Sequence, residues 1–170
     1  MASHAPSSRI RKSQLENRNC LMADELDVDI VTPDGRTFQG AASGVRAPGV
    51  DGSFEVRKDH APLIAAFDIG PLIVKTEAAH EYADMHNGRI VFATSGGFLE
   101  IVANKVTVLA ETVEPASEID VERAENAEQR ALRRLEDGVQ EPEEREKHEA
   151  ALERARNRLR VGMGQIGSQA

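Results

Sequence analysis

The feature that most constrains this 170-residue chain is a change of hydrophobic period at Pro115. Before it, apolar and polar residues alternate, as in Leu26, Val28 and Ile30, which is typical of a strand with one buried face. After it, apolar residues recur every three to four positions, the period of an amphipathic helix. Since the length suits about one domain, the chain is predicted to fold as a β region followed by a helical region.

Turn-forming residues divide the β region into short segments. They are Pro33-Asp34-Gly35, Pro48-Gly49, Asp51-Gly52, Gly70-Pro71, Asn87-Gly88, Gly96-Gly97 and Asn104. The β-rich runs between the later turns are Leu72–Lys75, Arg89–Ala93, Phe98–Val102 and Val106–Leu109. Because no helical segment separates these runs, we expect an all-β, antiparallel β-sandwich over residues 23–112 rather than a parallel sheet of βαβ units.

The helical region is predicted to be a hairpin over residues 116–161, followed by a flexible tail at 162–170. Ser117 is placed to cap the first helix and Gly138 to end it, while Pro142 suits the start of the second helix. The apolar stripes are narrow and rich in alanine: they consist of Ala124, Ala127, Ala131 and Leu135, and of His148, Leu152, Ala155 and Leu159. Such stripes bury little area, so we expect weak, reversible docking.

Composition excludes several classes of function. A net charge of −8 and 4% aromatic residues argue against nucleic-acid binding. The single cysteine cannot form an internal disulfide, and the longest uncharged run, Ile90–Leu99, is too short to span a membrane. Residues 1–22 have four basic residues against one acidic residue and no apolar core of a secretory signal. We expect a disordered extension or a start assigned before Met22, although a transit peptide would have a similar composition.

No catalytic constellation is evident. Ser95 precedes Gly96-Gly97, but the G-x-S-x-G pattern is absent and a structural turn is expected there. His60 has no second histidine at metal-ligand spacing, and His80 and His86 fit an exposed hairpin better than a metal site. No acidic pair is placed for general acid–base catalysis. The sequence therefore predicts neither a catalytic residue nor a metal ligand.

Arginines in the helical region are more informative. At about 100° per residue, Arg123 and Arg130 share one arc of the first helix with Asp120. Arg154 and Arg158 lie one turn apart on the second helix. A folded hairpin would bring these guanidinium groups to one rim, which suits phosphate binding, while the acid could accept from a ribose or adenine. The spacing also fits arginines that pair with the many glutamates of a solvated helix surface, so both interpretations stay open.

Segments in both regions, taken in order, resemble the ε subunit of F-type ATP synthases, which is the δ subunit in mitochondria. In the β region they are Val31-Thr32-Pro33-Asp34-Gly35, Ala47-Pro48-Gly49-Val50-Asp51-Gly52, His60-Ala61-Pro62-Leu63, Ser95-Gly96-Gly97-Phe98-Leu99-Glu100 and Asn104-Lys105-Val106-Thr107-Val108-Leu109-Ala110. The similarity covers roughly residues 24–112, and Ile119–Arg160 resembles the family's helical hairpin. It implies a non-catalytic central-stalk subunit that couples proton flow to ATP synthesis.

The resemblance also implies partners. In the family the sandwich grips the γ subunit and touches the polar loops of the c-ring, and Ser53 and His60 fall in the part that faces them. The family's Gly-Glu-Leu-Gly…Pro-Gly-His is here Gly52-Ser53-Phe54-Glu55…Lys58-Asp59-His60, so the acid is displaced and the Pro-Gly is absent. Association with a membrane would occur through the complex only, at the cytoplasmic face of the bacterial inner membrane.

A mobile hairpin is expected to inhibit ATP hydrolysis. Extended along γ, it would present four arginines to acidic surfaces of the catalytic α and β subunits and obstruct rotation. These arginines are Arg123, Arg130, Arg133 and Arg134.

A regulatory ATP site is also implied by the resemblance, although no cofactor is required. Ile119-Asp120-Val121-Glu122-Arg123-Ala124 matches the I/L-D-x-x-R-A motif with which some bacterial ε subunits bind ATP. The implied site consists of Glu114, Ile119, Asp120, Arg123, Ala124, Arg130, Arg154 and Arg158. Two alternatives remain: a free-standing ATP-sensing module that uses the same arginines, and an adaptor whose hairpin is only a coiled-coil arm.

Overall fold

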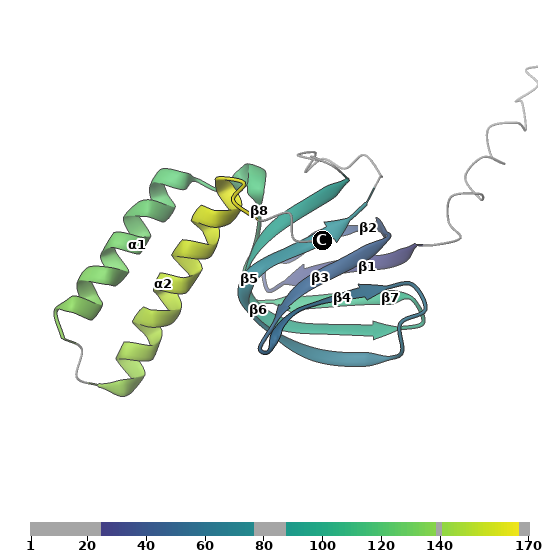
Figure 1. Ribbon diagram of the computed structural model, residues 1–170, viewed down its shortest axis with the longest axis horizontal. Coiled ribbons are helices and arrows are strands. Elements are labelled where there is room, and N and C mark those ends of the chain that lie inside the picture. Colours follow the sequence, from purple (N-terminus) through teal and green to yellow (C-terminus); the bar gives the residue numbers. More distant parts are fainter. Residues whose placement is uncertain (1–24, 77–87, 139–140, 167–170) are drawn as a thin grey trace, which may run out of the picture.

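The computed structural model describes residues 25–76, 88–138 and 141–166, which form a β-sandwich followed by a helical hairpin, as predicted (Figure 1). The strands are β1 Leu26–Thr32, β2 Gly35–Ala42, β3 Gly44–Gly49, β4 Gly52–Arg57, β5 Leu63–Lys75, β6 Arg89–Val102, β7 Lys105–Ala110 and β8 Val113–Pro115. A short 3₁₀ turn, η4 Ala116–Glu118, precedes α1 Val121–Glu136 and α2 Pro142–Gly162. The predictions for residues 1–22, for His80 and His86 and for the turn at Asn87 lie outside the described residues.

Two long strands build both layers of the sandwich. The strand order is β2-β1-β7-β6-β5-β3-β4, and β8 also pairs with β6. One half of β6 pairs with β7 and the other half with β8, while β5 follows β6 along its length and reaches β3 at its far end. The sheet therefore folds over on itself (Figure 1). The core between its layers is built on large, fully buried side chains that include Leu26, Ile30, Leu72, Phe92, Leu99 and Ile101.

The predicted turns at Gly70-Pro71 and Gly96-Gly97 are wrong, because both pairs lie inside strands β5 and β6. Gly96 has a φ of 90°, and a Cβ on Gly97 would lie 2.1 Å from the carbonyl oxygen of Leu109. A Cβ on Gly70 would lie 2.7 Å from the Pro48 ring. These glycines allow long strands to pass close to neighbouring backbone, which is the other common use of glycine in strands.

One pair of strands departs from the antiparallel expectation. β1 lies parallel to β7, with Val28 opposite Val106 and Ile30 opposite Val108. A parallel pair needs a long crossover but not necessarily a helical one. Here the crossover is the run of strands from β2 to β6, so the absence of helices in the sequence did not exclude it.

The first helix is capped by Asp120 rather than by the predicted Ser117. Ser117 lies in the 3₁₀ turn, and Ile119 is extended. Asp120 then accepts a hydrogen bond from the backbone N–H of Arg123 at 2.9 Å, the usual N-cap geometry. Gly138, with a φ of 82°, follows the end of α1 and Pro142 begins α2, as predicted.

The hairpin touches the sandwich through α2, which lies between α1 and the sheet (Figure 1). In the described part of the chain, the apolar part of this contact is a small cluster in which Ala93, Ile119 and Val161 are buried and Val91, Ala116 and Ile166 are partly buried. Between the helices, the predicted stripes face each other and bury Ala124, Ala131, Leu152 and Ala155. Within the described residues, no helix is both long and apolar enough to cross a membrane.

Glu55, the acid that is displaced relative to the family's motif, forms an ion-pair cluster with Arg57 of β4 and Lys75 of β5. Lys75 Nζ lies 2.9 and 2.8 Å from its two carboxylate oxygens, and Arg57 Nε lies 2.6 Å from one of them. Burial opposes ionisation, but hydrogen bonds and charge from Lys75 and Arg57 outweigh it and hold the pKa of Glu55 below its usual value. Glu55 is thus engaged within the sandwich.

Glu55→Gln is expected to lower the stability of the sandwich at neutral pH and to remove part of its acid sensitivity. Because the pKa is lowered by folding, the carboxylate contributes stability above its unfolded pKa, and this contribution is lost as pH falls through the folded pKa. The neutral-pH loss should be about 1.5 kcal/mol. Urea unfolding at pH 7 and pH 3 measures both effects, and equal acid sensitivity in the two proteins would contradict the assignment.

Candidate functional site

The I-D-x-x-R-A segment fixes the foot of the hairpin. Asp120 caps α1 through the backbone of Arg123, and Ala124, 2% exposed, is buried in the helical hairpin. Ile119 belongs to the cluster that docks the hairpin on β6. A Cβ on Gly162 would lie 2.9 Å from Ile119 Cγ2, so the end of α2 packs directly against Ile119. Three motif positions therefore have a structural role before any ligand is considered.

Glu114 and Arg158 are the two predicted site residues that the structure joins across the domains. Arg158 Nε lies 2.5 Å from Glu114 Oε2, and both side chains are about one-third exposed. The pair links α2 to β8. A phosphate that bound Arg158 would compete with Glu114 for the same guanidinium group.

Arg154 lies beside Arg158 over a narrow hollow between α2 and the sheet. The hollow is too small to admit a water molecule and is lined by Ala93, Thr94, Thr112, Arg154, Asn157 and Arg158. Asn157 is 1% exposed and donates from Nδ2 to the carbonyl oxygen of Thr94 at 3.1 Å. Its Oδ1 has no hydrogen-bond partner among the described residues, which costs about 1–3 kcal/mol. Sequence reasoning missed Asn157, because a polar residue on a helix gives no sign that it is buried.

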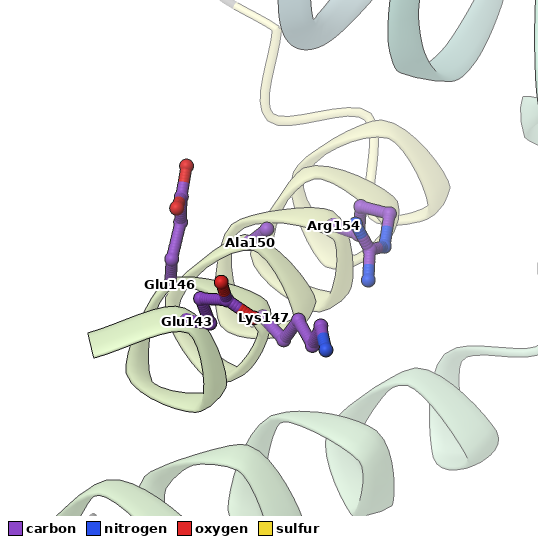
Figure 2. Close-up of a pocket in the computed structure, with 5 residues that line it drawn as sticks. All are labelled: Glu143, Glu146, Lys147, Ala150 and Arg154. Carbon is purple, nitrogen blue, oxygen red and sulfur yellow. The ribbon is translucent and has the colours of Figure 1, made fainter. Parts of the chain in front are cut away.

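A shallow depression runs along α2 on the side of Arg154 (Figure 2). It has a volume of about 370 Å³ and is lined by Glu143, Glu146, Lys147, Ala150 and Arg154, all from one helix. Figure 2 shows Lys147 and Arg154 extending to one side of α2 and Glu146 to the other. This arrangement offers two cations two turns apart to an anion that approaches from solvent.

The arginines of α1 are exposed to solvent. Arg123 and Arg130 are exposed, and Arg133 and Arg134 are exposed in the last turn of the helix. In the described part of the chain none of these four forms an ion pair, whereas Arg156 of α2 pairs with Glu128 at 2.9 Å. The structure therefore joins Glu114 to Arg158 and places Arg154 beside it, while among the described residues neither Arg123 nor Arg130 forms an ion pair with this group.

The two predicted rotor contacts lie on different parts of the sandwich. Ser53 is the second residue of β4, and its Oγ accepts from Arg46 Nε at 3.0 Å and from Nη2 at 2.6 Å. His60 is exposed between β4 and β5, with Nδ1 2.8 Å from the carbonyl oxygen of Ala61. Both side chains remain near the surface, and the imidazole is open to solvent.

An apolar surface on strands β5, β6 and β7 was missed by sequence reasoning. Phe98 is 58% exposed and lies opposite Leu109, which is 52% exposed. Ile64 on β5 is 70% exposed and lies opposite Glu100, two residues from Phe98 on the same face. A groove of about 540 Å³ borders Phe98 and Leu109. We call Ile64, Phe98, Val102 and Leu109 the outer apolar face. The sequence carried a signal for it: Phe98 and Val102 are apolar on one alternation of the strand, although Glu100 lies between them, and Leu99 and Ile101 are apolar on the other. Apolar residues on both faces of a strand predict cover on both sides.

Two family models together match nearly all of the described chain. Residues 25–116 match the β-sandwich domain of the ATP synthase delta/epsilon chain, and residues 117–162 match its long α-helix domain. The chain belongs to the ATP synthase delta/epsilon family.

Curated relatives specify the kind of chain. The ATP synthase epsilon chain of Salinibacter ruber is 80% identical, over 87% of this chain and 99% of the relative. That of Halalkalibacterium halodurans is 38% identical, over 80% of this chain and 96% of the relative. This chain is accordingly an epsilon-type subunit of an F-type ATP synthase, a stalk component and not an enzyme in itself.

Solved structures show the same fold at low sequence identity. A chain in the mitochondrial ATP synthase of Euglena gracilis matches with a TM-score of 0.65 and 20% identity, over 82% of this chain and 81% of that chain. A chain from the Tetrahymena thermophila enzyme matches with a TM-score of 0.53 and 13% identity, over 83% and 96%.

Proposed function

We propose that this subunit docks on the γ subunit through the outer apolar face and so helps to couple proton flow to ATP synthesis. The observation that carries the proposal is that Phe98, Leu109 and Ile64 are exposed together on one face of a well-packed sandwich. Exposed apolar surfaces of this kind mark interaction sites. The solved chain from Tetrahymena comes from an assembly described as central stalk and c-ring, which supports a rotor partner.

Contacts with the c-ring are proposed for the end of the sandwich that carries Ser53, and contacts with γ for the His60 loop, which leads into Ile64 of the outer apolar face. Val50, 72% exposed, is at the tip of the same β3–β4 hairpin as Ser53. This exposed hairpin tip offers both an apolar and a polar side chain to the loops of a partner. The subunit would then sit at the cytoplasmic face of the bacterial inner membrane, held there by the complex.

The hairpin is proposed to alternate between the docked form and one extended along γ. Among the described residues, its docked form depends on a small apolar cluster, on one buried amide whose oxygen has no partner there and on the Glu114–Arg158 pair. Such a contact can open without unfolding the sandwich core. In the extended form, the exposed cations at the end of α1, Arg133 and Arg134, would reach acidic surfaces of the catalytic subunits.

ATP is proposed to favour the docked form by binding to it alone. The ligand would meet Arg154 and Arg158 on α2 and the arginines of α1, Arg123 and Arg130. A ligand shifts such an equilibrium only by its difference in affinity for the two forms, so ATP would relieve inhibition when it is abundant. The two alternatives, a free-standing ATP-sensing module and an adaptor with a coiled-coil arm, do not explain why the outer apolar face is exposed.

Hydrolysis of ATP by the complex is expected to rise several-fold when residues 116–170 are removed. The obstructing arm is then absent, while the described sandwich, which ends with β8 at Pro115, is retained. Arg133→Ala with Arg134→Ala should reproduce part of this rise, because these side chains are exposed and have no ion-pair partner in the described residues. Equal hydrolysis rates in the full and shortened complexes would show that the hairpin does not inhibit.

A further inference from the structure

Asn104 connects three segments at one end of the sandwich. It lies in the tight turn between β6 and β7, where Ala103 and Asn104 have φ values of 49° and 63°. Its backbone oxygen accepts from the N–H of Asp27 at the start of β1, at 2.9 Å. Its side chain reaches across to the β4–β5 loop, 45 residues away in sequence.

The contact with that loop is reciprocal. Asn104 Oδ1 accepts from the backbone N–H of Asp59 at 2.7 Å, and Asn104 Nδ2 donates to Asp59 Oδ1 at 3.1 Å. Asp59 itself has a φ of 60°, a left-handed conformation that is uncommon for residues other than glycine. The two bonds therefore hold Asp59 in a conformation that it would otherwise seldom adopt.

The direction of the chain at Asp59 determines where His60 lies. His60 follows directly and donates its backbone N–H to the carbonyl oxygen of Arg57 at 3.1 Å, which closes the turn. Four residues later the chain reaches Ile64 of the outer apolar face, and Val102 of the same face precedes the Asn104 turn. The Asn104–Asp59 pair thus ties together the two loops that border this end of the face.

We infer that Asn104 is a positioning residue for rotor binding: through Asp59, it holds the His60 loop in the conformation that the γ subunit recognises. The inference rests on the proposed docking to γ and adds a residue that need not touch the partner. A loop that is correctly placed for only part of the time binds with an apparent Kd raised by the inverse of that fraction.

The test measures the affinity of full-length variants for purified γ. Asn104→Gly keeps the left-handed turn, because glycine tolerates it, but removes both side-chain bonds, and it should raise the Kd roughly tenfold. Asn104→Asp should also weaken binding, because it sets a second carboxylate against Asp59. Combining Asp59→Asn with Asn104→Asp reverses donor and acceptor in the side-chain bond and leaves a carboxylate oxygen to accept from the backbone N–H of residue 59. The net charge is unchanged, and the Kd should return to within about twofold of wild type.

A purely structural role is excluded by two further measurements. Val74→Ala removes volume from the core at the far end of β5, where this strand pairs with β3, so it should lower the melting temperature and leave γ binding unchanged. The amide of Asp59 should lose hydrogen-exchange protection in Asn104→Gly and regain it in the exchanged pair. Equal γ affinity for wild type and Asn104→Gly, or no recovery in the exchanged pair, would overturn the inference while leaving γ docking intact. A wild-type chain that did not bind γ would instead overturn the proposed function together with this inference.

Discussion

Replacing Phe98 with aspartate is expected to weaken binding to γ by about a hundredfold. Phe98 is 58% exposed and central to the outer apolar face, with Leu109 opposite it on β7. Burying an aromatic side chain of this size contributes about 1.5–3 kcal/mol, and a carboxylate at the same place would also have to lose its hydration. Central aromatic residues are common hot spots of protein interfaces.

The sandwich itself should tolerate this substitution, because the Phe98 side chain points away from the core between the layers. Met163, 44% exposed beyond the end of α2, offers a matched control. Met163→Asp introduces the same charge on an exposed apolar residue outside the face and should leave the Kd for γ unchanged. If the two variants bound γ equally well in a titration, the outer apolar face would not be the docking surface.

Arg123→Ala is expected to weaken ATP binding by the isolated protein by roughly tenfold or more, because a charge-assisted contact to phosphate contributes about 1.5–3 kcal/mol. Arg158→Ala should weaken it similarly, although this variant also removes the partner of Glu114. Arg123 has no ion-pair partner among the described residues and is therefore the cleaner variant. Calorimetry with residues 23–170 measures the effect.

Arg160 supplies the control for this prediction. It is exposed in the last turn of α2, outside the implied site, and Arg160→Ala should change the affinity little. ATP should also increase the hydrogen-exchange protection of both helices, because a ligand of the docked form stabilises that form. No heat at millimolar ATP, or equal losses of ATP affinity in Arg123→Ala and Arg160→Ala, would show that these arginines are only solvated surface charges.

Local sequence patterns predicted the helical hairpin well. Ala124, Ala131, Leu152 and Ala155 are buried as the helical period requires, and Gly138 lies at the end of α1 as expected. The cap was misplaced because serine and aspartate both suit the position, and the choice depends on how Ile119 packs under Gly162. Tertiary contact decides between two locally acceptable starts.

Features that depend on contacts between distant parts of the chain were harder to predict from the sequence. Gly96-Gly97 is compatible with a turn and with a bent strand, and only the approach of the Leu109 backbone distinguishes them. The parallel pairing of β1 with β7 depends on the order of strands in space. The Asn104–Asp59 pair joins residues 45 apart, and no spacing rule connects them.

The structure brings together only some of the residues of the implied ATP site. The Glu114–Arg158 pair is a real contact between the domains, whereas Arg123 and Arg130 lie on the exposed side of α1. The motif residues were identified through resemblance, but the structure shows that Ile119, Asp120 and Ala124 also hold the hairpin together. Their presence is therefore explained in part without a nucleotide.

The most direct test of docking through the outer apolar face is whether the sandwich alone binds γ. A chain that ends at Pro115 keeps β8 on β6 and the whole outer apolar face, and it should be expressed in cells that lack the full-length subunit. We expect γ and the catalytic subunits to co-purify with it from detergent-solubilised membranes, as with the full chain. A shortened chain with an intact β-sheet spectrum that fails to retain γ would show that the sandwich alone does not carry the docking surface.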